Sequence, residues 1–366
     1  MSAAAVRRAL PVLAVLPLLA LTACGYGSRA KADDTVKAVP GAARTDGLDS
    51  VRIGYFGNVT HATALVGNRK GFFQQALGGT EAKYAVFNAG PSEIEALNAG
   101  SIDIGWIGPS PAVNGYVRSG GENLRIVGGS ASGGVKLVVN PGKIKSVRDV
   151  AGKRIATPQL GNTQDVAFLH WAAEQGWRVD AQSGKGDVTV VRSDNKVTPD
   201  AFRTGSVDGA WVPEPTASRL VAEGGKVLVD EAGLWPEQKF VTTNIVVRQE
   251  FLAEHPEAVE TVLKASVATN RWIEAHPEAA KAAANEQLRA DSGAALPADV
   301  LDPAWESLTV TDDPLAATLA AQSRHAAAAG LLDDPDLDGI YDLTLLDKVL
   351  EAEGEPAVDD AGLGVR

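Results

Sequence analysis

A pattern of residues that occurs twice constrains the fold of this 366-residue chain most strongly. The stretch "ALNAGSIDIGWIGPSP" (96–111) aligns with "AFRTGSVDGAWVPEP" (201–215), so that Gly, Ser, Asp and Trp recur at matching positions. Each copy predicts a helix that ends at a glycine, then a short strand and a proline-containing loop. A pattern that occurs only twice indicates two similar lobes rather than a solenoid.

A looser match supports the same interpretation. "RIGYFGNVTH", from Arg52, and "RIATPQLGNTQ", from Arg154, both run from a strand through Gly-Asn into a helix start. Strands that alternate with helices favour a parallel α/β sheet. In the first lobe we expect strands at 51–56, in "EAKYAVFNAG" and in "SIDIGWIG", with helices over 62–70 and from Pro91 to near Gly100.

Two apolar strands, at 135–140 and 240–248, bracket the second lobe, as a hinge of two crossings requires. After Gln249 the chain is mainly helical, and two "HPEA" segments place proline in the first turn of a helix. We expect these helices to pack on the first lobe. The predicted organisation is lobe 1 over 50–136, lobe 2 over 137–240, and a return to lobe 1 over 241–366.

Loops at the carboxyl ends of the strands are the candidate binding residues, because ligands of open α/β sheets bind there. The duplicated pattern supplies four such loops, which line one cleft if the two lobes face each other. From these loops and the return strand we expect ligand contacts from Asn58, Thr60, His61, Gly108, Ser110, Gln159, Asn162, Thr163, Gln164, Glu214 and Thr242.

The turn "LGNTQD" is the candidate anion site. Asn162 is a good helix N-cap, and Asp165 three residues later resembles a capping box. The N–H groups of Thr163 and Gln164 would then point out of the helix start, where the helix dipole favours an anion without Lys or Arg. The alternative is that this segment only caps a helix.

Three further residues leave a choice between site and scaffold. Trp106 and Trp211, at matching positions, either wall the cleft against an organic tail or fill the two cores. Glu214 either holds the amine of a zwitterionic ligand or pairs with a cation such as Arg219, and we favour the pairing. The five histidines lack metal-ligand spacing, and no nucleophile–base pair stands out, so we predict no metal, no cofactor and no enzymatic activity.

The N-terminus predicts export. Residues 1–23 combine Arg7 and Arg8 with a short apolar run, and "LTAC" places small residues before Cys24, as in a lipoprotein signal. The alternative for Cys24 is an unpaired thiol in a cleaved peptide. Residues 24–49 are small, polar and aperiodic, which is typical of a flexible tether. We therefore expect a protein anchored by lipid to the outer face of the plasma membrane or on the periplasmic side, without a spanning helix.

Charge and cysteine content narrow the partners. The formal net charge of -12 disfavours nucleic acid as a partner. Because Cys24 is the only cysteine, the chain has no intrachain disulfide and no thiolate zinc site. We expect a monomer.

Many motifs, in order, resemble the substrate-binding lipoproteins of ABC importers, nearest to the aliphatic sulfonate, taurine and nitrate branch. They include the lipobox, "IGYFG", "GKRIATPQLGNTQDVAFLHW", "KFVTTNIVVRQEFLAEHPEAV" and "NRWIEAHPEAA", and the resemblance extends to about residue 350. It implies a type II periplasmic-binding-protein fold: two α/β lobes, a two-strand hinge and a mainly helical C-terminal part.

The resemblance also implies roles for residues. Sulfonate-group contacts are implied for Gly108, Ser110, Asn162, Thr163 and Gln164, whereas the Trp and His positions would contact the organic part. Taurine binders often have alanine at the position of Glu214, so this chain departs from the pattern for an exact taurine site.

The expected function is capture of an aliphatic sulfonate or a taurine-like organosulfonate, and its delivery to an ABC permease with its ATPase subunit. The alternatives are a receptor for nitrate, another small oxyanion or a thiamine-pyrimidine-type ligand, and a two-lobed ligand sensor. An enzyme of the same fold would need reactive His or Cys groups in the cleft.

Overall fold

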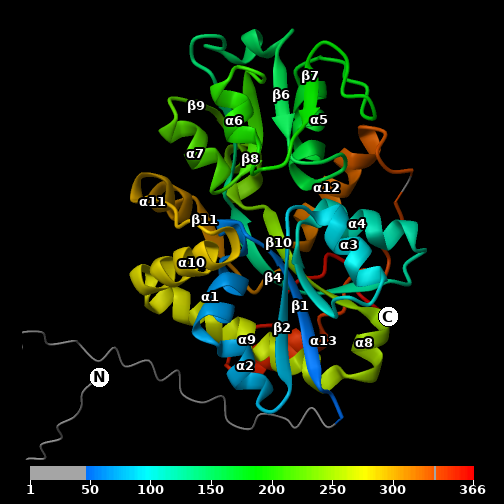
Figure 1. The fold of residues 1–366 in the computed structure, drawn as a ribbon. Helices are drawn as coiled ribbons and strands as arrows, with labels where there is room; N and C mark the ends of the chain where they lie inside the picture. The colour runs from blue at the N-terminus through cyan, green and yellow to red at the C-terminus, as the bar shows by residue number, and fades with distance from the viewer. Residues whose placement is uncertain (1–46, 334) are drawn as a thin grey trace, which may run out of the picture. The chain divides into compact units, whose positions relative to one another are not determined.

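The computed structural model describes residues 47–333 and 335–366. The predicted export signal, Cys24 and most of the predicted tether lie outside the described residues. The described part forms two β-sheets with helices packed around them (Figure 1). Among these residues, no helix is both long enough and apolar enough to cross a membrane.

The first sheet has six strands in the order β11-β4-β10-β3-β1-β2. β1 is parallel to β2 and β3, β10 is antiparallel to β3 and β4, and β11 is antiparallel to β4. The elements of this part are β1 (Ser50–Phe56), β2 (Glu81–Phe87), β3 (Ile104–Ile107), β4 (Leu124–Gly133), β10 (Val241–Arg248) and β11 (Leu308–Val310), with η1 (Val59–His61), α1 (Ala62–Lys70), α2 (Phe72–Leu77), α3 (Gly90–Asn98) and α4 (Pro109–Arg118). Of these, β1, β2, β3, β10, α1 and α3 were predicted with bounds close to those found, and the others were not predicted.

The second sheet has five strands in the order β7-β6-β8-β5-β9. β6 is parallel to β7 and β8, whereas β5 is antiparallel to β8 and β9. The order β7-β6-β8-β5-β9 repeats the order β2-β1-β3-β10-β4 of the first sheet. Its elements are β5 (Val135–Val139), η2 (Val147–Val150), β6 (Arg154–Thr157), α5 (Thr163–Glu174), β7 (Thr189–Arg192), α6 (Thr198–Arg203), β8 (Gly209–Pro213), α7 (Thr216–Ala222), β9 (Lys226–Asp230), η3 (Glu231–Leu234) and η4 (Pro236–Gln238).

The predicted parallel strands are present, but β5 and β10 run antiparallel to their neighbours, and the crossings of the chain explain why. β5 follows the passage from the first sheet to the second, and β10 follows the passage back. A strand that arrives from the other sheet begins beside the carboxyl ends of the parallel strands, so it runs antiparallel to them. Neither apolar strand is itself a crossing, because each belongs wholly to one sheet.

The first crossing is a turn at two glycines. Gly133 and Gly134, between β4 and β5, have φ values of 82° and 72°, which only glycine adopts readily. The second crossing runs from β9 through η3 and η4 to β10. The predicted lobe boundary between residues 136 and 137 falls within β5, and the division into lobes at residues 137 and 241 stays a prediction.

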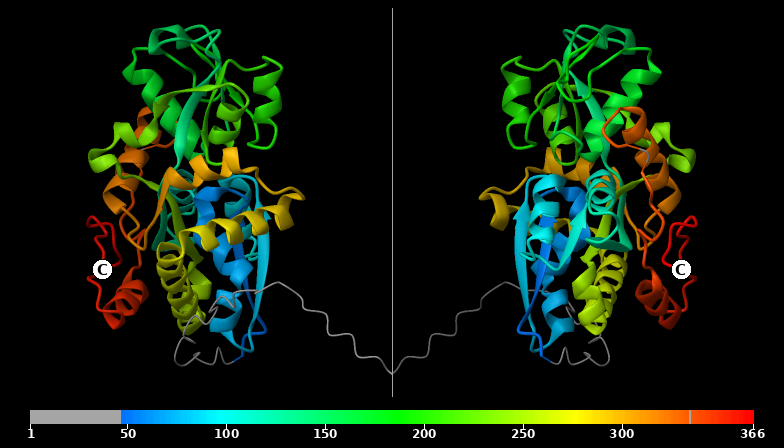
Figure 2. Two further views of the ribbon diagram at one scale, coloured as in Figure 1. Left: turned by 90° about the vertical axis from the view of Figure 1, so that its left-hand side faces the viewer. Right: turned by 90° about the vertical axis from the view of Figure 1, so that its right-hand side faces the viewer.

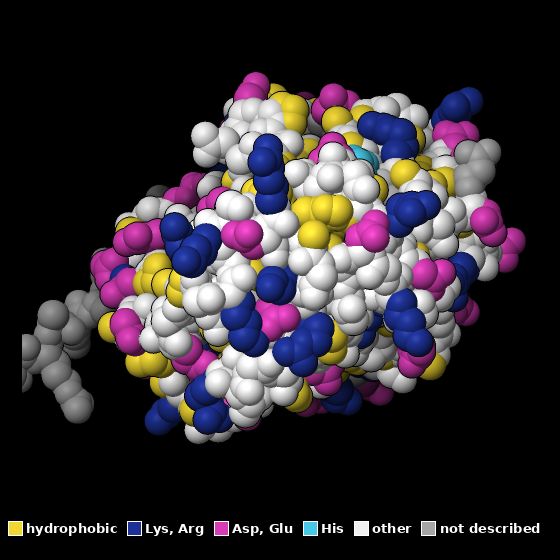
Figure 3. Space-filling model, turned by 90° about the horizontal axis from the view of Figure 1, so that it is seen from above, with side chains coloured by type: hydrophobic (Ala, Val, Ile, Leu, Met, Phe, Trp, Pro, Cys, Tyr) yellow, Lys and Arg dark blue, Asp and Glu magenta, His cyan; other side chains and the backbone are white. Residues whose placement is uncertain are grey.

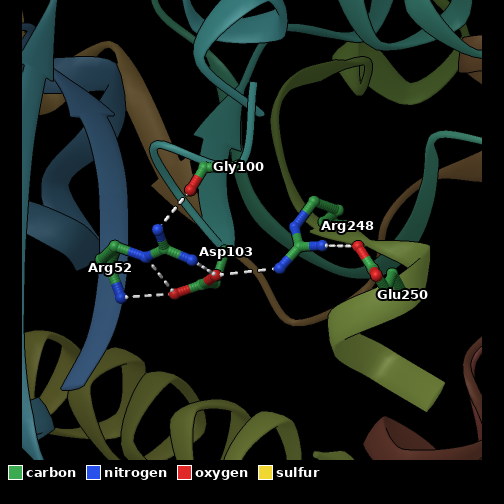
Figure 4. A network of polar contacts seen from close by, with 5 residues as sticks. All are labelled: Arg52, Gly100, Asp103, Arg248 and Glu250. Atoms are coloured by element: carbon green, nitrogen blue, oxygen red, sulfur yellow. Dashed lines mark hydrogen bonds and ion pairs between the residues drawn. The ribbon is translucent and has the colours of Figure 1, made fainter. Parts of the chain in front are cut away.

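The duplicated sequence pattern builds the same polar network in each sheet. Arg52 donates from its backbone N–H and its Nε to Asp103 Oδ2, both at 2.9 Å, and its guanidinium donates to the carbonyl of Gly100 (Figure 4). Arg248, at the end of β10, also reaches Asp103 and continues to Glu250 (Figure 4). Through Arg52, β1 is therefore bonded to the segment between the end of α3 and the start of β3, which contains Gly100 and Asp103.

The second lobe uses matching residues. The backbone N–H of Arg154 donates to Asp208 at 3.0 Å, and the Arg154 guanidinium donates to the carbonyl of Gly205 at 2.6 Å. The Lys143 ammonium adds a bond of 2.6 Å to the same carboxylate. The recurring Asp and Gly of the sequence pattern thus have structural roles.

The C-terminal helices contact helices of the first lobe, where they were expected to pack, and also helices of the second. α9 and α10 pack against α1, and both begin at the expected prolines of the "HPEA" segments. α11 packs against α7, and α12 packs against both α4 and α5, so these two contact helices of the second sheet (Figures 1 and 2). These helices are α8 (Gln249–Glu254), α9 (Pro256–Ala275), α10 (Pro277–Ser292), α11 (Ala298–Glu306), α12 (Ala316–Ala328) and α13 (Thr344–Ala352).

The face seen from the side of β6 and β7 carries charges of both signs. Lys and Arg side chains alternate with Asp and Glu side chains over this face (Figure 3). Mixed charges of this kind do not add up to a strong field of one sign.

Candidate functional site

A small polar cavity lies where the strand ends of the two sheets meet. Its volume is about 20 Å³. Residues from both sheets line it, and among the described residues none of them is Lys, Arg, Asp or Glu. The predicted site residues that it brings together are Asn58, Thr60, His61, Gly108, Asn162, Thr163, Gln164 and Thr242.

Two residues that line the cavity, Asn88 and Asn195, were not predicted from the sequence. Asn88 directly follows β2, and Asn195 lies three residues after β7. Both obey the rule that binding residues follow the carboxyl ends of strands. The strand β2 was predicted, but no binding residue was assigned to its carboxyl end, and the strand β7 was not predicted.

His61 contributes a neutral donor from the first lobe. Its Nδ1 accepts a hydrogen bond of 3.3 Å from the backbone N–H of Phe56, which places the proton of the neutral ring on Nε2. Burial lowers the pKa of His61 to about 3, so the imidazole is uncharged at neutral pH. The ring also packs against that of Phe56, with centroids 4.4 Å apart.

The start of α5 contributes backbone donors from the second lobe. Asn162 is the N-cap, and its carbonyl accepts from the N–H groups of Asp165 and Val166. The N–H groups of Thr163 and Gln164, at the first two helical positions, have no acceptor within the helix. The positive end of the helix dipole and two N–H groups are therefore available at this wall of the cavity.

The predicted capping box is wrong. The Asn162 side chain makes no cap bond and instead donates to Gln164 Oε1 at 3.2 Å. The Asp165 carboxylate accepts from the Gly161 N–H and the Thr157 hydroxyl, and it pairs with Arg192 at 3.0 Å. Because Arg192 neutralises it, the buried Asp165 does not oppose an anion at the helix start.

Two buried hydroxyls near the strand ends lack partners. Within the part of the chain that the structure describes, Ser110 Oγ and Thr163 Oγ1 have no hydrogen-bond partner. A buried polar group without a partner costs about 1–3 kcal/mol. Thr163 lines the polar cavity, whereas Ser110, on α4, lies outside the set of lining residues. Both are donors that a bound oxyanion could satisfy.

Trp106 and Trp211 do not wall the polar cavity. Trp106 is fully buried against Phe73, with ring centroids 5.2 Å apart, and belongs to the core of the first lobe. Trp211 is fully buried against Phe168 and donates its indole N–H to Glu231 at 2.7 Å. Trp106 therefore fills the core, as the alternative interpretation held, and Trp211 belongs to the core of the second lobe while also lining a separate cavity.

Glu214 is a scaffold residue that pairs with a cation, as favoured, although the cation is Lys136 rather than the suggested Arg219. Its fully buried carboxylate pairs with Lys136, on the neighbouring strand, at 2.7 Å, and not with Arg219. It also accepts from the Ser218 N–H at 2.9 Å. Gln159 does not line the cavity either, since its side chain donates to Asp194 at 3.3 Å.

A larger cavity of about 260 Å³ adjoins the polar one and shares Asn58, Asn88 and Asn195 with it. Apolar side chains from β2 and α10 form part of its wall, and charged groups lie among them. The apolar residues include Val86, Phe87, Leu288 and Leu296, and the charged ones are Lys196, Arg219 and Asp291. The contribution of α10 was not foreseen, because nothing in a helical pattern indicates which lobe opening it overlies.

Two similar sheets, crossed twice by the chain and with a polar cavity at their facing strand ends, define a two-lobed binding protein of the periplasmic-binding-protein fold. The chain belongs to the NMT1-like family, whose model matches residues 45–287. The predicted fold is thus confirmed.

Three proteins that are similar to this chain are named as binding proteins. A putative binding protein of Brucella abortus is 28% identical over 244 residues, covering 66% of this chain and 72% of that protein. The taurine-binding periplasmic protein of Escherichia coli is 28% identical over 206 residues, covering 55% of this chain and 60% of that protein. The alkanesulfonate-binding protein SsuA from Xanthomonas axonopodis pv. citri, solved with MOPS, has the same fold, with a TM-score of 0.64, 24% identity, and coverage of 78% of this chain and 95% of that one.

Proposed function

We propose that this protein is an extracytoplasmic solute receptor that captures an aliphatic or taurine-like sulfonate between its lobes and delivers it to an ABC permease. The observation that carries the proposal is the polar cavity. It combines the N-terminus of α5 with hydroxyl, amide and neutral imidazole groups, and charged residues are absent from its described lining. Helix N-terminal N–H groups bind oxyanions without a basic side chain.

The protonation chemistry of the donors favours a sulfonate over a phosphate. A sulfonate is a monoanion at neutral pH and carries no proton, so donors alone satisfy it. A hydrogen phosphate also needs an acceptor for its own proton. His61 supplies no such acceptor, because its Nδ1 already accepts from the Phe56 N–H and its neutral ring presents only the Nε2 donor.

The adjoining cavity suits an organic tail. Val86, Phe87 and Leu288 offer apolar surface beside the shared asparagines, in place of the tryptophans that the sequence suggested. Asp291 lies in the same wall and suits the amine of a taurine-like ligand. The tail is therefore assigned to the opening between β2 and α10.

A receptor for nitrate or another small oxyanion is the second candidate. The polar cavity by itself, at about 20 Å³, suits a ligand without a tail. The adjoining 260 Å³ cavity favours the sulfonate, because a small oxyanion would leave its apolar wall unused. Sulfonates of increasing chain length separate the two candidates.

Capture proceeds by closure of the lobes around the hinge. A ligand that bonds to the start of α5 and to η1 bridges both lobes and shifts the population toward the closed form. Transport, anchoring through Cys24 and a non-enzymatic role belong to the same proposal. His61 lies in the cavity but is not placed to act as a base, since its Nδ1 already accepts a hydrogen bond from the Phe56 N–H.

Calorimetry with methane-, ethane- and butanesulfonate, taurine, nitrate and sulfate tests the proposal. We expect one-to-one binding of the sulfonates with a tail, and at least tenfold weaker binding of nitrate. Binding restricted to uncharged ligands would overturn the sulfonate assignment, and preference for nitrate would support the second candidate. Uptake of the bound sulfonate by cells that carry or lack the protein separates transport from sensing.

A further inference from the structure

A third cavity, of about 250 Å³, adjoins the start of α5. Residues of α5, of η3 and η4, and of α12 line it, and Thr163 is the residue that it shares with the polar cavity. The sulfonate proposal makes no use of this cavity.

Three indole rings are the main feature of its wall: Trp171, Trp211 and Trp235. The rings of Trp171 and Trp211 lie with centroids 5.5 Å apart and tilted by 51°. The ring of Trp235 stacks on Phe240 at 5.7 Å, which fixes its orientation. Indole faces attract cations through the negative face of the ring quadrupole, and tryptophan is the best of the aromatic residues in this role.

Two buried side chains in the wall offer acceptor oxygens. Glu231 is 2% exposed, and its carboxylate accepts a hydrogen bond of 2.7 Å from the Trp211 indole N–H. Gln322 is 4% exposed, and among the described residues its Oε1 has no hydrogen-bond partner. No Lys or Arg is found among the described lining residues. The wall therefore offers negative charge, an unused acceptor and aromatic faces.

Two stacked histidines lie at the rim of this cavity. The rings of His170, on α5, and His325, on α12, stack with centroids 3.4 Å apart. Burial, together with His170 and Arg324, lowers the pKa of His325 to about 4. The imidazole of His325 is therefore uncharged at neutral pH and does not oppose a cation.

We propose that this cavity is a second binding site, which takes a small organic cation such as an alkylammonium or quaternary ammonium ion. The cation lies against the three indole rings, with its charge toward Glu231. Solvent reaches the rim, since Leu234 is 49% exposed and the Glu174 side chain is 56% exposed. Apart from Thr163, the residues of this site differ from those of the anion site, and choline titration alone tests it independently of the sulfonate proposal.

Choline is the probe, and 3,3-dimethyl-1-butanol is its uncharged control of the same shape. Titration of the full chain at pH 8, followed by tryptophan fluorescence and calorimetry, is expected to show saturable one-to-one binding of choline. The neutral alcohol is expected to bind at least tenfold more weakly. Binding of choline is expected to persist in saturating ethanesulfonate. No saturable choline binding, equal binding of the alcohol, or displacement by ethanesulfonate would each overturn the proposal.

Matched substitutions locate the site. Glu231→Gln keeps the acceptor for Trp211 but removes the charge, and is expected to weaken choline binding at least tenfold. Glu237→Gln, in the same segment but with a side chain 81% exposed, is expected to leave it unchanged. Trp235→Leu provides a second variant, with the same expected loss, if Glu231→Gln folds poorly. Equal affinities in all of these proteins would contradict the assignment.

The pH dependence gives a readout on the unaltered protein. The titratable groups that face the cavity are His170 and Glu174 from α5, Glu231 from η3 and His325 from α12, with Asp230 beside Glu231. Burial raises the pKa of Glu231 to about 7, against the hydrogen bonds from Trp211 and Trp235. Choline binding is therefore expected to weaken from pH 8 to pH 5.5. Affinity that is constant over this range would contradict the role of Glu231.

Discussion

Gly108 and Thr163 approach each other so closely across the polar cavity that a Cβ atom added to Gly108 would lie 2.4 Å from Thr163 Oγ1. Gly108 follows β3 in the first lobe, and Thr163 begins α5 in the second. The φ angle of Gly108 is −69°, which any residue can adopt. Space, rather than backbone conformation, therefore requires glycine at this position.

Gly108→Ala is expected to lower sulfonate affinity at least tenfold. The added methyl group must either turn the Thr163 hydroxyl away or hold the lobes apart, and both weaken a ligand bridge between them. Calorimetry with ethanesulfonate measures the effect. Gly79→Ala, where an added Cβ meets nothing within 4 Å, is the control and is expected to bind as the unaltered protein does. Equal affinities of the two variants would contradict direct contact between the lobes.

The repeated pattern predicted much of the fold because its residues have local structural roles. Asp103 and Asp208 hold matching arginines, and the glycines at 100 and 205 end helices and accept from those arginines. Such contacts lie within one lobe and require particular residues at matching positions, which the sequence shows. The antiparallel direction of β5 and β10 requires no particular residues, because it follows from the path of the chain between the lobes.

The candidate site was predicted unevenly for a similar reason. Residues such as Asn58 and Thr163 follow strands, and their position could be inferred from the strand pattern alone. The direction of a side chain on a strand could not, so Trp106 and Trp211 were left open and lie in the cores. The partner of Glu214 is Lys136 on a neighbouring strand, a pairing that depends on sheet order.

Lys136→Met is expected to destabilise the protein by about 3–5 kcal/mol, because it leaves Glu214 as an unpaired buried charge. Chemical denaturation at neutral pH measures the loss. Lys239→Met removes an exposed partner of Glu237 and is expected to change stability by less than about 1 kcal/mol. A loss for Lys136→Met as small as that for Lys239→Met would show that the Glu214 carboxylate is neutral or solvated.

Glu93→Gln is expected to stabilise the protein increasingly as the pH rises. Glu93 lies on α3 beneath β1 and β3, and within the described residues neither of its carboxyl oxygens has a partner. Burial raises its pKa well above the usual value. A raised pKa means that the folded protein binds the proton more tightly, so the contribution of Glu93 to stability is lost from about pH 4.5 upward.

Denaturation of both proteins at pH 4 and pH 8 tests this sign. We expect the smallest difference at pH 4, where Glu93 is protonated in the folded state and mostly protonated in the unfolded state, and a more stable variant at pH 8. A difference that does not depend on pH would mean that the carboxyl group titrates normally in the folded protein.

The most direct test of the anion site is calorimetry of Thr163→Pro with ethanesulfonate. Proline at the first helical position removes a donor N–H without breaking the helix, and Asn162, at φ −70° and ψ 161°, already has the conformation that precedes proline. Thr163→Val is the control that keeps the N–H and loses only the hydroxyl. We predict that Thr163→Pro lowers affinity more than Thr163→Val and at least tenfold below the unaltered protein, with the melting temperature preserved. Affinity that is unchanged in a folded Thr163→Pro protein would contradict the proposal that the start of α5 binds the sulfonate.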